Sequence, residues 1–158
     1  MPHEIDTEVI TTPITGQETD ATSEQHAVLT QFYRAFNCRD LDLMRANWLD
    51  GDDITMDNPL GGIKRGWREI GPVYEKLFNG PARVYVEFYD YSLHETPGMF
   101  YAVGCERGRF ERDGETIDLA IRTSRIFLRV EAWRQVHHHG SIDDPELLAR
   151  YQQAVLGR

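Results

Sequence analysis

The sequence predicts an α+β fold in which a curved antiparallel sheet wraps around three N-terminal helices, with an extra helix at the C-terminus. Apolar residues recur at helical spacing up to residue 79, and from residue 82 to residue 141 the period changes to two. A run of helices followed by a run of strands is typical of α+β domains. Because a long antiparallel sheet curls, helices on its concave face form a cone with an internal pocket.

Two helices are expected before residue 51. The first starts near Ser23, because Thr22 and Gln25 fit a capping box and apolar residues then recur at helical spacing up to Phe36. Asp40 is placed to cap a shorter second helix, since an aspartate side chain accepts hydrogen bonds from the first free backbone N–H groups.

A short strand and a third helix follow. The strand covers Ile54–Asp57, and Asn58 with Pro59 breaks it, because proline lacks a backbone donor. The third helix follows Gly66. Pro72 fits this helix badly, so either it kinks the helix or the regular part begins there, with proline in the first position.

Four consecutive strands and a last helix complete the chain. Ile117, Leu119, Ile121 and Thr123 share one face of the third strand. Asp144 caps the last helix and Gly157 ends it. The expected strands are Ala82–Leu93, Met99–Glu111, Glu115–Leu128 and Trp133–Ser141.

Composition limits the class of protein. The chain has 158 residues and a net charge of −9, and its two cysteines cannot form a disulfide framework. Residues 1–24 hold six acids and no Lys or Arg, so we expect a flexible acidic arm over 1–22, a domain over 23–141 and a helical extension over 142–158. The body has no basic face, which argues against nucleic-acid binding. The sequence shows no membrane span or signal peptide, and we expect a cytoplasmic protein.

Three segments carry a resemblance to a known superfamily. They are residues 32–40 (FYRAFNCRD), residues 57–67 (DNPLGGIKRGW), and residues 121–127 with 133–141 (IRTSRIF and WRQVHHHGS). Together they resemble the nuclear-transport-factor-2-like, or SnoaL-like, superfamily over about residues 23–141. Residues 121–127 and 133–141 are similar to the closing hairpin of SnoaL-like domains and of the association domain of calcium/calmodulin-dependent protein kinase.

The resemblance implies a small-molecule-binding domain and leaves its activity open, because fold alone does not determine function. One reading is an isomerase, cyclase or dehydratase that transfers protons on a carbonyl or hydroxyl compound without a cofactor. The alternative is a non-catalytic ligand-binding or assembly module. A small organic ligand with a carboxylate or a carbonyl group is the expected partner in both.

Asp57, His139 and Tyr33 are the candidate catalytic residues. The resemblance implies an acid directly before the proline of the 57–61 turn, where this chain has Asn58 and the acid has moved to Asp57. Neighbouring strand residues face opposite ways, so either Asp57 faces an apolar pocket and acts as a base, or Asn58 lines the pocket. Tyr33 lies beside Phe32, the position that resembles the isomerases' tyrosine.

His137 and His139 are expected to share one strand face with Trp133 and Gln135, whereas His138 points the other way. We interpret His137 as a ligand-binding residue and His139 as an acid–base residue. No spacing typical of zinc ligands is present, so no metal and no cofactor are expected.

Four further residues are candidates for ligand binding. Arg122 and Arg125 lie on opposite faces of their strand, and the resemblance favours Arg122 inside, either paired with an acid such as Asp57 or Glu106 or holding a ligand carboxylate. The four candidates are Asn58, Trp48, Arg122 and Trp67.

Aromatic residues spread over both strand faces predict a homodimer through the outer sheet face.

Overall fold

The computed structural model describes residues 8–157, in which the chain forms four helices and six strands. The strand β2 is the one element in this range that the sequence pattern does not predict. The elements are α1 (Glu24–Asn37), α2 (Leu41–Asn47), β1 (Thr55–Asp57), β2 (Lys64–Arg65), α3 (Gly66–Asn79), β3 (Arg83–Glu95), β4 (Met99–Arg112), β5 (Glu115–Val130), β6 (Ala132–Ser141) and α4 (Pro145–Leu156).

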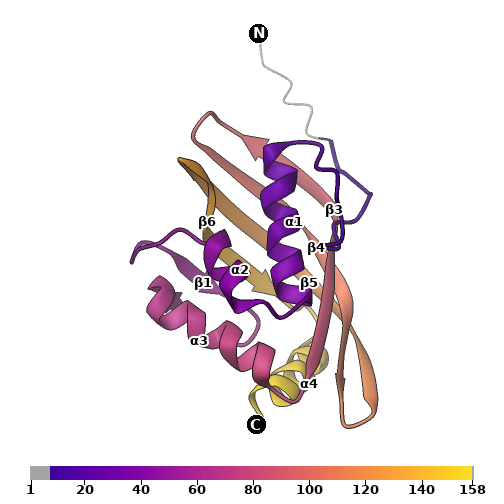
Figure 1. Cartoon of the computed structure of the whole chain (residues 1–158). Coiled ribbons are helices and arrows are strands. Elements are labelled where there is room, and N and C mark those ends of the chain that lie inside the picture. The colour runs from indigo at the N-terminus through magenta and orange to yellow at the C-terminus, as the bar shows by residue number, and fades with distance from the viewer. Residues whose placement is uncertain (1–7, 158) are drawn as a thin grey trace.

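All six strands form one open, mixed sheet in the order β2-β1-β6-β5-β4-β3. Neighbouring strands are antiparallel except β1 and β6, which run parallel. The helices α1, α2 and α3 cover one face of the curved sheet, which we call the inner face, and α4 lies at one end of it (Figure 1). The predicted α+β class, with helices inside a curved sheet and an additional C-terminal helix, is confirmed.

Local sequence signals set the helix ends. The Ser23 side chain accepts a hydrogen bond from the backbone N–H of His26 at 3.0 Å, and Asp40 and Asp144 cap α2 and α4 in the same way. Gly157 ends α4 in the left-handed conformation at φ 74°. The helix α3 begins at Gly66 and continues through Pro72, so its regular part does not start at the proline.

The core lies between the helices and the inner face of the sheet. It is dominated by aromatic side chains from α1, α3 and the long strands, which are the expected apolar positions. Polar residues are buried among them, and these residues position the candidate site. The largest fully buried side chains include Trp48, Arg125, Tyr33, Tyr74, Phe32, Phe88, Phe100 and Phe127.

The segment before α1 differs from the expected flexible arm over residues 1–22. Ile14 is fully buried, and its backbone pairs with Phe88 of β3, as Ile10 pairs with Tyr91. The Arg34 side chain donates hydrogen bonds to the Gly16 and Glu18 carbonyls at 2.8 and 2.7 Å. These contacts hold residues 9–18 against α1 and β3, so the prediction of a solvated arm is wrong there. Residues 1–7 lie outside the described residues.

The expected extension over residues 142–158 contains α4, which packs on the same core as the rest of the chain. Tyr151 and Val155 of α4 are buried members of the apolar core. Within residues 8–157, no helix combines the length and the apolar character that a membrane crossing requires.

Candidate functional site: a polar cluster inside the cone

A cluster of polar side chains lies between the sheet and the helices. Arg125 on β5 is 1% exposed and Glu106 on β4 is 4% exposed. Both project from the inner face, as do Thr123 on β5, and Gln135 and His138 on β6. Burying this many polar groups lowers stability unless each finds a partner. Their presence therefore marks the interior as the candidate site.

The Arg125 side chain contacts several neighbouring side chains. One of its Nη atoms donates a hydrogen bond to Gln135 Oε1 at 2.8 Å, and the other forms an ion pair with Glu106 Oε2 at 3.4 Å. Its guanidinium group also lies 3.5 Å from the centre of the Phe32 ring. The positive charge is thus neutralised inside the protein, and a ligand carboxylate placed beside Arg125 would also meet Glu106.

Neighbouring residues extend this network. The Thr123 hydroxyl donates to Glu106 Oε1 at 2.6 Å, and the Gln135 amide donates to Asn47 Oδ1 at 2.9 Å. The Nε of Arg125 lies 3.4 Å from the Tyr33 hydroxyl. Burial, reinforced by the negative charge of Glu106, raises the pKa of Tyr33 well above its usual value, so this hydroxyl remains protonated.

His138 is buried and uncharged at neutral pH. Burial, followed by the positive charge of Arg125, lowers the pKa of this imidazole well below its usual value. Its Nδ1 lies 3.3 Å from the Ser124 carbonyl oxygen, which can only accept a hydrogen bond. We therefore assign the proton to Nδ1, which leaves Nε2 as a proton acceptor.

A cavity of about 30 Å³ adjoins these groups. Glu106, Arg125, His138 and Tyr74 contribute to its lining. Tyr74 is 2% exposed, and its hydroxyl faces two donors, the Trp48 indole and the Arg125 guanidinium, but no acceptor among the residues that the structure describes. Burial raises the pKa of Tyr74 to about 12, so the hydroxyl is a donor without an acceptor.

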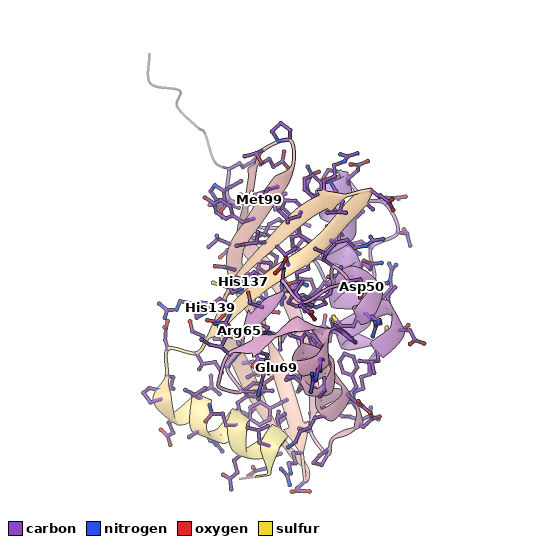
Figure 2. All side chains as sticks on the ribbon, turned by 90° about the vertical axis from the view of Figure 1, so that its left-hand side faces the viewer. Asp50, Arg65, Glu69, Met99, His137 and His139 are labelled. Atoms are coloured by element: carbon purple, nitrogen blue, oxygen red, sulfur yellow. The ribbon has the colours of Figure 1, made fainter. Side chains whose placement is uncertain are left out.

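Three of the predicted site residues form a different cluster, on the opposite, outer face of the sheet. His139 Nδ1 lies 2.7 Å from Asp57 Oδ2, and His137 Nε2 lies 3.6 Å from Asp57 Oδ1. Thr55 Oγ1 bonds His137 Nδ1 at 2.7 Å. Figure 2 shows His137 and His139 together on β6. The structure brings these residues together as expected, but away from the interior.

A β-bulge explains this placement. Ile126 of β5 pairs with His137, whereas the next residue, Phe127, pairs with Gln135, so Val136 is an extra residue in β6. Gln135 and His138 therefore both face inward. The expectation that His137 and His139 share the face of Gln135 is wrong, because it assumed unbroken alternation along the strand.

The two arginines of β5 also exchange their expected positions. Arg122 is exposed, bonds Ser141 Oγ at 3.2 Å and pairs with Asp143 at 2.9 Å. Arg125 takes the inner place. Continuing the face of Ile121 and Thr123 by two residues leads to Arg125, so the alternation of β5 carried the signal that the resemblance overrode.

The remaining predicted residues lie nearer the interior. Asn58 borders the cavity, and its Oδ1 accepts from the Leu60 N–H at 3.1 Å, so Asn58 rather than Asp57 is the inner residue of the pair. Trp48 is buried with its ring centre 6.4 Å from Tyr74. Trp67 is half-buried and stacks on Tyr74, with ring centres also 6.4 Å apart.

The arrangement offers a proton acceptor and proton donors in one apolar enclosure. His138 Nε2 can accept a proton, and the Tyr74 hydroxyl can donate a hydrogen bond to an oxygen of a bound molecule. Such a pair is what a proton transfer next to a carbonyl group requires. Within the described part of the chain, no three His, Cys, Asp or Glu side chains are grouped so as to hold a metal ion.

Comparison with known proteins identifies the fold family. The SnoaL-like domain family matches residues 26–145. A nuclear transport factor 2 (NTF2-like) superfamily protein from Salmonella enterica is similar in structure, with a TM-score of 0.65 and 18% identity over 75% of this chain and 89% of that one. A ketosteroid isomerase-like protein from Erwinia carotovora atroseptica is similar too, with a TM-score of 0.62 and 17% identity over 75% of this chain and 93% of that one.

The CaMKII hub of S. rosetta is also similar, with a TM-score of 0.63 and 15% identity over 75% of this chain and 93% of that one. At these identities the likeness shows the fold alone. No curated protein matches the chain. The family match covers most of the sequence and agrees with the curved sheet and the polar interior: the chain belongs to the SnoaL-like domain family.

Proposed function

We propose that the chain binds a small, uncharged organic molecule with a hydroxyl or carbonyl group inside the cone. The observation that carries the proposal is the Tyr74 hydroxyl, which is buried at the cavity and has no hydrogen-bond acceptor among the described residues. Buried polar groups are nearly always hydrogen-bonded, so a donor without an acceptor beside a cavity points to a ligand atom. His138, whose Nδ1 bonds the Ser124 carbonyl, lines the same cavity.

The charge balance of the interior favours an uncharged ligand over a carboxylate. Arg125 is paired with Glu106, and the two charges cancel. A carboxylate would lose its hydration in the interior and approach Glu106 without gaining a free guanidinium group. Of the two ligand classes expected from the sequence, the carbonyl or hydroxyl class is therefore the one that we propose.

Trp48 provides a built-in reporter for this proposal. Its indole ring lies 6.4 Å from Tyr74, whereas Trp133 packs on Phe100, with ring centres 5.0 Å apart. Titration with p-cresol or cyclohexanone should shift the Trp48 indole N–H signal in a nitrogen–proton NMR spectrum and leave that of Trp133 in place. Benzoate, a charged probe of similar size, should shift neither.

The Tyr74→Phe variant tests whether the Tyr74 hydroxyl binds the ligand. Removing one hydrogen bond to a neutral ligand should weaken binding of the probe about fivefold, without unfolding the chain, since no described residue accepts a hydrogen bond from this hydroxyl. Tyr85→Phe is the matched control, because the Tyr85 hydroxyl contacts Glu87 on the outer face. Equal affinity in wild type and in Tyr74→Phe would refute the proposed role of the hydroxyl.

We further propose that two copies associate through the outer face of the sheet. Tyr101 and Val103 on β4 are 39% and 41% exposed, and Ile126, which pairs with Tyr101, is partly exposed beside them. Adjacent exposed apolar side chains on one face of a sheet favour an interface. A second copy of the chain is the simplest partner for this patch, since a two-fold interface pairs the same patch with itself.

Light scattering tests the association directly. Wild type should have twice the 18.3 kDa mass of the chain, and Val103→Glu should have the mass of one chain. Ile63→Glu is the control, because Ile63 is 60% exposed in the segment between β1 and β2, away from this face. A wild-type mass of 18.3 kDa would contradict the proposal.

A further inference from the structure

The helix α4 closes one end of the interior. The family match ends at residue 145, where α4 begins, so this helix is an addition to the shared domain. Its residue Tyr151 is 4% exposed and lines the same cavity as Glu106, Arg125 and His138. The phenol ring lies 5.6 Å from the ring of Phe110 on β4. Part of the ligand space in the cone is thus filled by a side chain of the protein itself.

The Tyr151 side chain has the chemistry of an uncharged aromatic alcohol. Burial, reinforced by the negative charge of Glu106, raises the pKa of Tyr151 far above its usual value, so the phenol stays protonated. With this ring in place, the remaining cavity of about 30 Å³ has room for little more than one water molecule. An organic ligand therefore needs space that a side chain now fills, and Tyr151 is one of the side chains that line this cavity.

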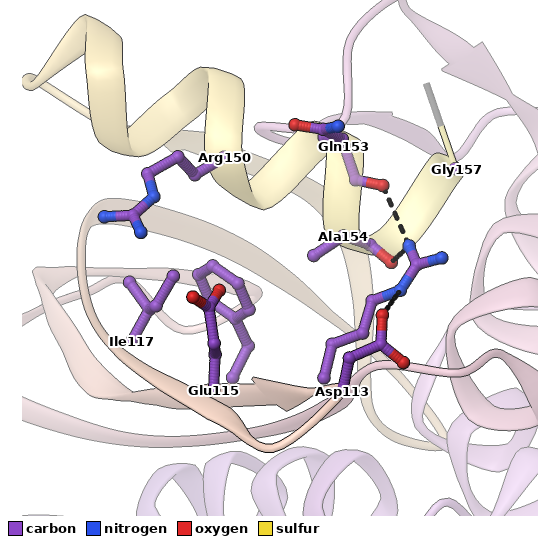
Figure 3. Close-up of a pocket in the computed structure, with 9 residues that line it drawn as sticks. Asp113, Glu115, Ile117, Arg150, Gln153, Ala154 and Gly157 are labelled. Atoms are coloured by element: carbon purple, nitrogen blue, oxygen red, sulfur yellow. Dashed lines mark hydrogen bonds and ion pairs between the residues drawn. The ribbon is translucent and has the colours of Figure 1, made fainter.

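Few polar contacts fasten α4 to the rest of the molecule. The Gln152 side chain donates to the Pro59 carbonyl at 2.9 Å. Arg112 of β4 donates to the carbonyls of Gln153 and Ala154 at 3.1 and 2.6 Å, near the C-terminal end of the helix (Figure 3). The remaining attachment is apolar packing of Tyr151 and its buried neighbours.

Hollows border α4 on two sides. One, of about 710 Å³, lies between α4, α3 and the segment after β1, and is lined by Pro72, Lys76, Gln152 and Leu156 among others. The other, of about 300 Å³, lies between α4 and the β4–β5 hairpin, and includes Glu115, Ile117 and Arg150 (Figure 3). These hollows leave room for α4 to move, whereas its buried residues Tyr151, Ala154 and Val155 hold it on the core.

We propose that α4 is a displaceable plug, that Tyr151 holds the place of the ligand, and that the ligand is an uncharged phenol. This inference rests on the proposed function, since it assigns the occupant of the same cavity. A phenol that replaces Tyr151 keeps the ring contact with Phe110. Its hydroxyl finds acceptors at Glu106 and His138 Nε2 and a donor at Tyr74.

Removing the plug's side chain should reveal the site. In the full-length Tyr151→Ala variant, p-cresol should bind at least about tenfold more tightly than in wild type, because it no longer competes with the phenol of Tyr151. The Trp48 indole N–H signal reports the binding. Toluene, which lacks the hydroxyl group, should bind this variant about fivefold more weakly than p-cresol.

A second pair of variants tests whether α4 moves, as opposed to a cavity created only by truncating Tyr151. Gln152→Ala keeps Tyr151 but removes the bond to Pro59, so the population with α4 displaced and the affinity for p-cresol should both rise about fivefold. Gln153→Ala should match wild type, because only the backbone carbonyl of Gln153 bonds Arg112. In wild type, p-cresol should accelerate hydrogen exchange of the α4 amides.

The possible failures are distinguishable. Binding of p-cresol with equal affinity to wild type, Gln152→Ala and Gln153→Ala, with no change in α4 exchange, would overturn the plug and leave the proposed function standing. Tighter binding of toluene than of p-cresol to Tyr151→Ala would overturn the phenol assignment. If no probe moves the Trp48 signal in any variant, including Tyr151→Ala, the proposed function itself is contradicted.

Discussion

Arg125 and Glu106 form the central interaction of the interior at the scale of single residues. Both side chains are almost fully buried, so each charge depends on the other and on Gln135 and Thr123 for its solvation. A buried pair of this kind contributes little net stability compared with apolar residues, but losing one partner leaves an uncompensated charge.

Arg125→Met should therefore lower the free energy of unfolding by about 3–5 kcal/mol, because it leaves Glu106 buried without its partner. The double variant Arg125→Met/Glu106→Leu should recover most of this loss. Urea denaturation at neutral pH measures both. Arg107→Met, which breaks an exposed pair with Glu87, is the control and should change stability little. A double variant no more stable than Arg125→Met would contradict the account.

His138 makes stability depend on pH. Because its pKa is lowered in the folded chain, the unfolded chain binds the proton more readily, and acid favours unfolding. The stabilisation is complete above about pH 6.5 and is lost as the pH falls from there towards the folded pKa, by at most about 1.4 kcal/mol per pH unit. His138→Asn should flatten the dependence of unfolding free energy on pH between about pH 6.5 and about pH 5. An unchanged slope would show that His138 is not the group responsible.

At the scale of elements, the sequence signals for helices and strands are local, and they were enough to place nearly all of them. Asp40 and Asp144 cap helices as expected, and alternation marks the four long strands. The bulge at Val136 could not be predicted, because it arises from how β6 pairs with β5, and it reverses the faces of all three histidines. This bulge accounts for the misplacement of His137 and His139.

The docking of residues 9–18 was missed for a similar reason. Single bridges such as Ile14 with Phe88 leave no periodic pattern in the sequence. Alternation along β5 indicates that Arg125 is an inner residue. No local signal distinguishes Tyr151 from an ordinary residue on the apolar side of α4. Pairing between distant segments, and not local propensity, decides which polar groups meet in the interior.

Gly16 tests whether the segment before α1 is a structural element. Its φ is +93°, and a Cβ there would clash with the backbone nitrogen of Arg34. Gly16→Ala should therefore destabilise the chain by more than about 1 kcal/mol and speed hydrogen exchange at the amides of Ile10 and Ile14. Gly98→Ala, with no atom within 4 Å of the added Cβ, is the control. Equal exchange in the two variants would argue against docking.

At the scale of the whole molecule, charge opposes association. Each chain carries −9, so two copies repel one another unless salt screens them. The proposed contact is apolar at Tyr101 and Val103, so its attraction does not weaken as salt screens the charges. The dimer dissociation constant, measured by analytical ultracentrifugation, should therefore decrease as sodium chloride is raised from low to physiological concentration. Weaker association at higher salt would indicate an interface held by ion pairs instead.

The central claim is that the interior of the cone is a ligand site that Tyr151 now fills. A crystal of the Tyr151→Ala variant soaked with p-cresol tests it most directly. The account predicts difference density for one ring beside Phe110, with its hydroxyl within hydrogen-bond distance of Tyr74 and of Glu106 or His138. Water alone in that space, or a neighbouring side chain collapsed into it, would contradict the claim.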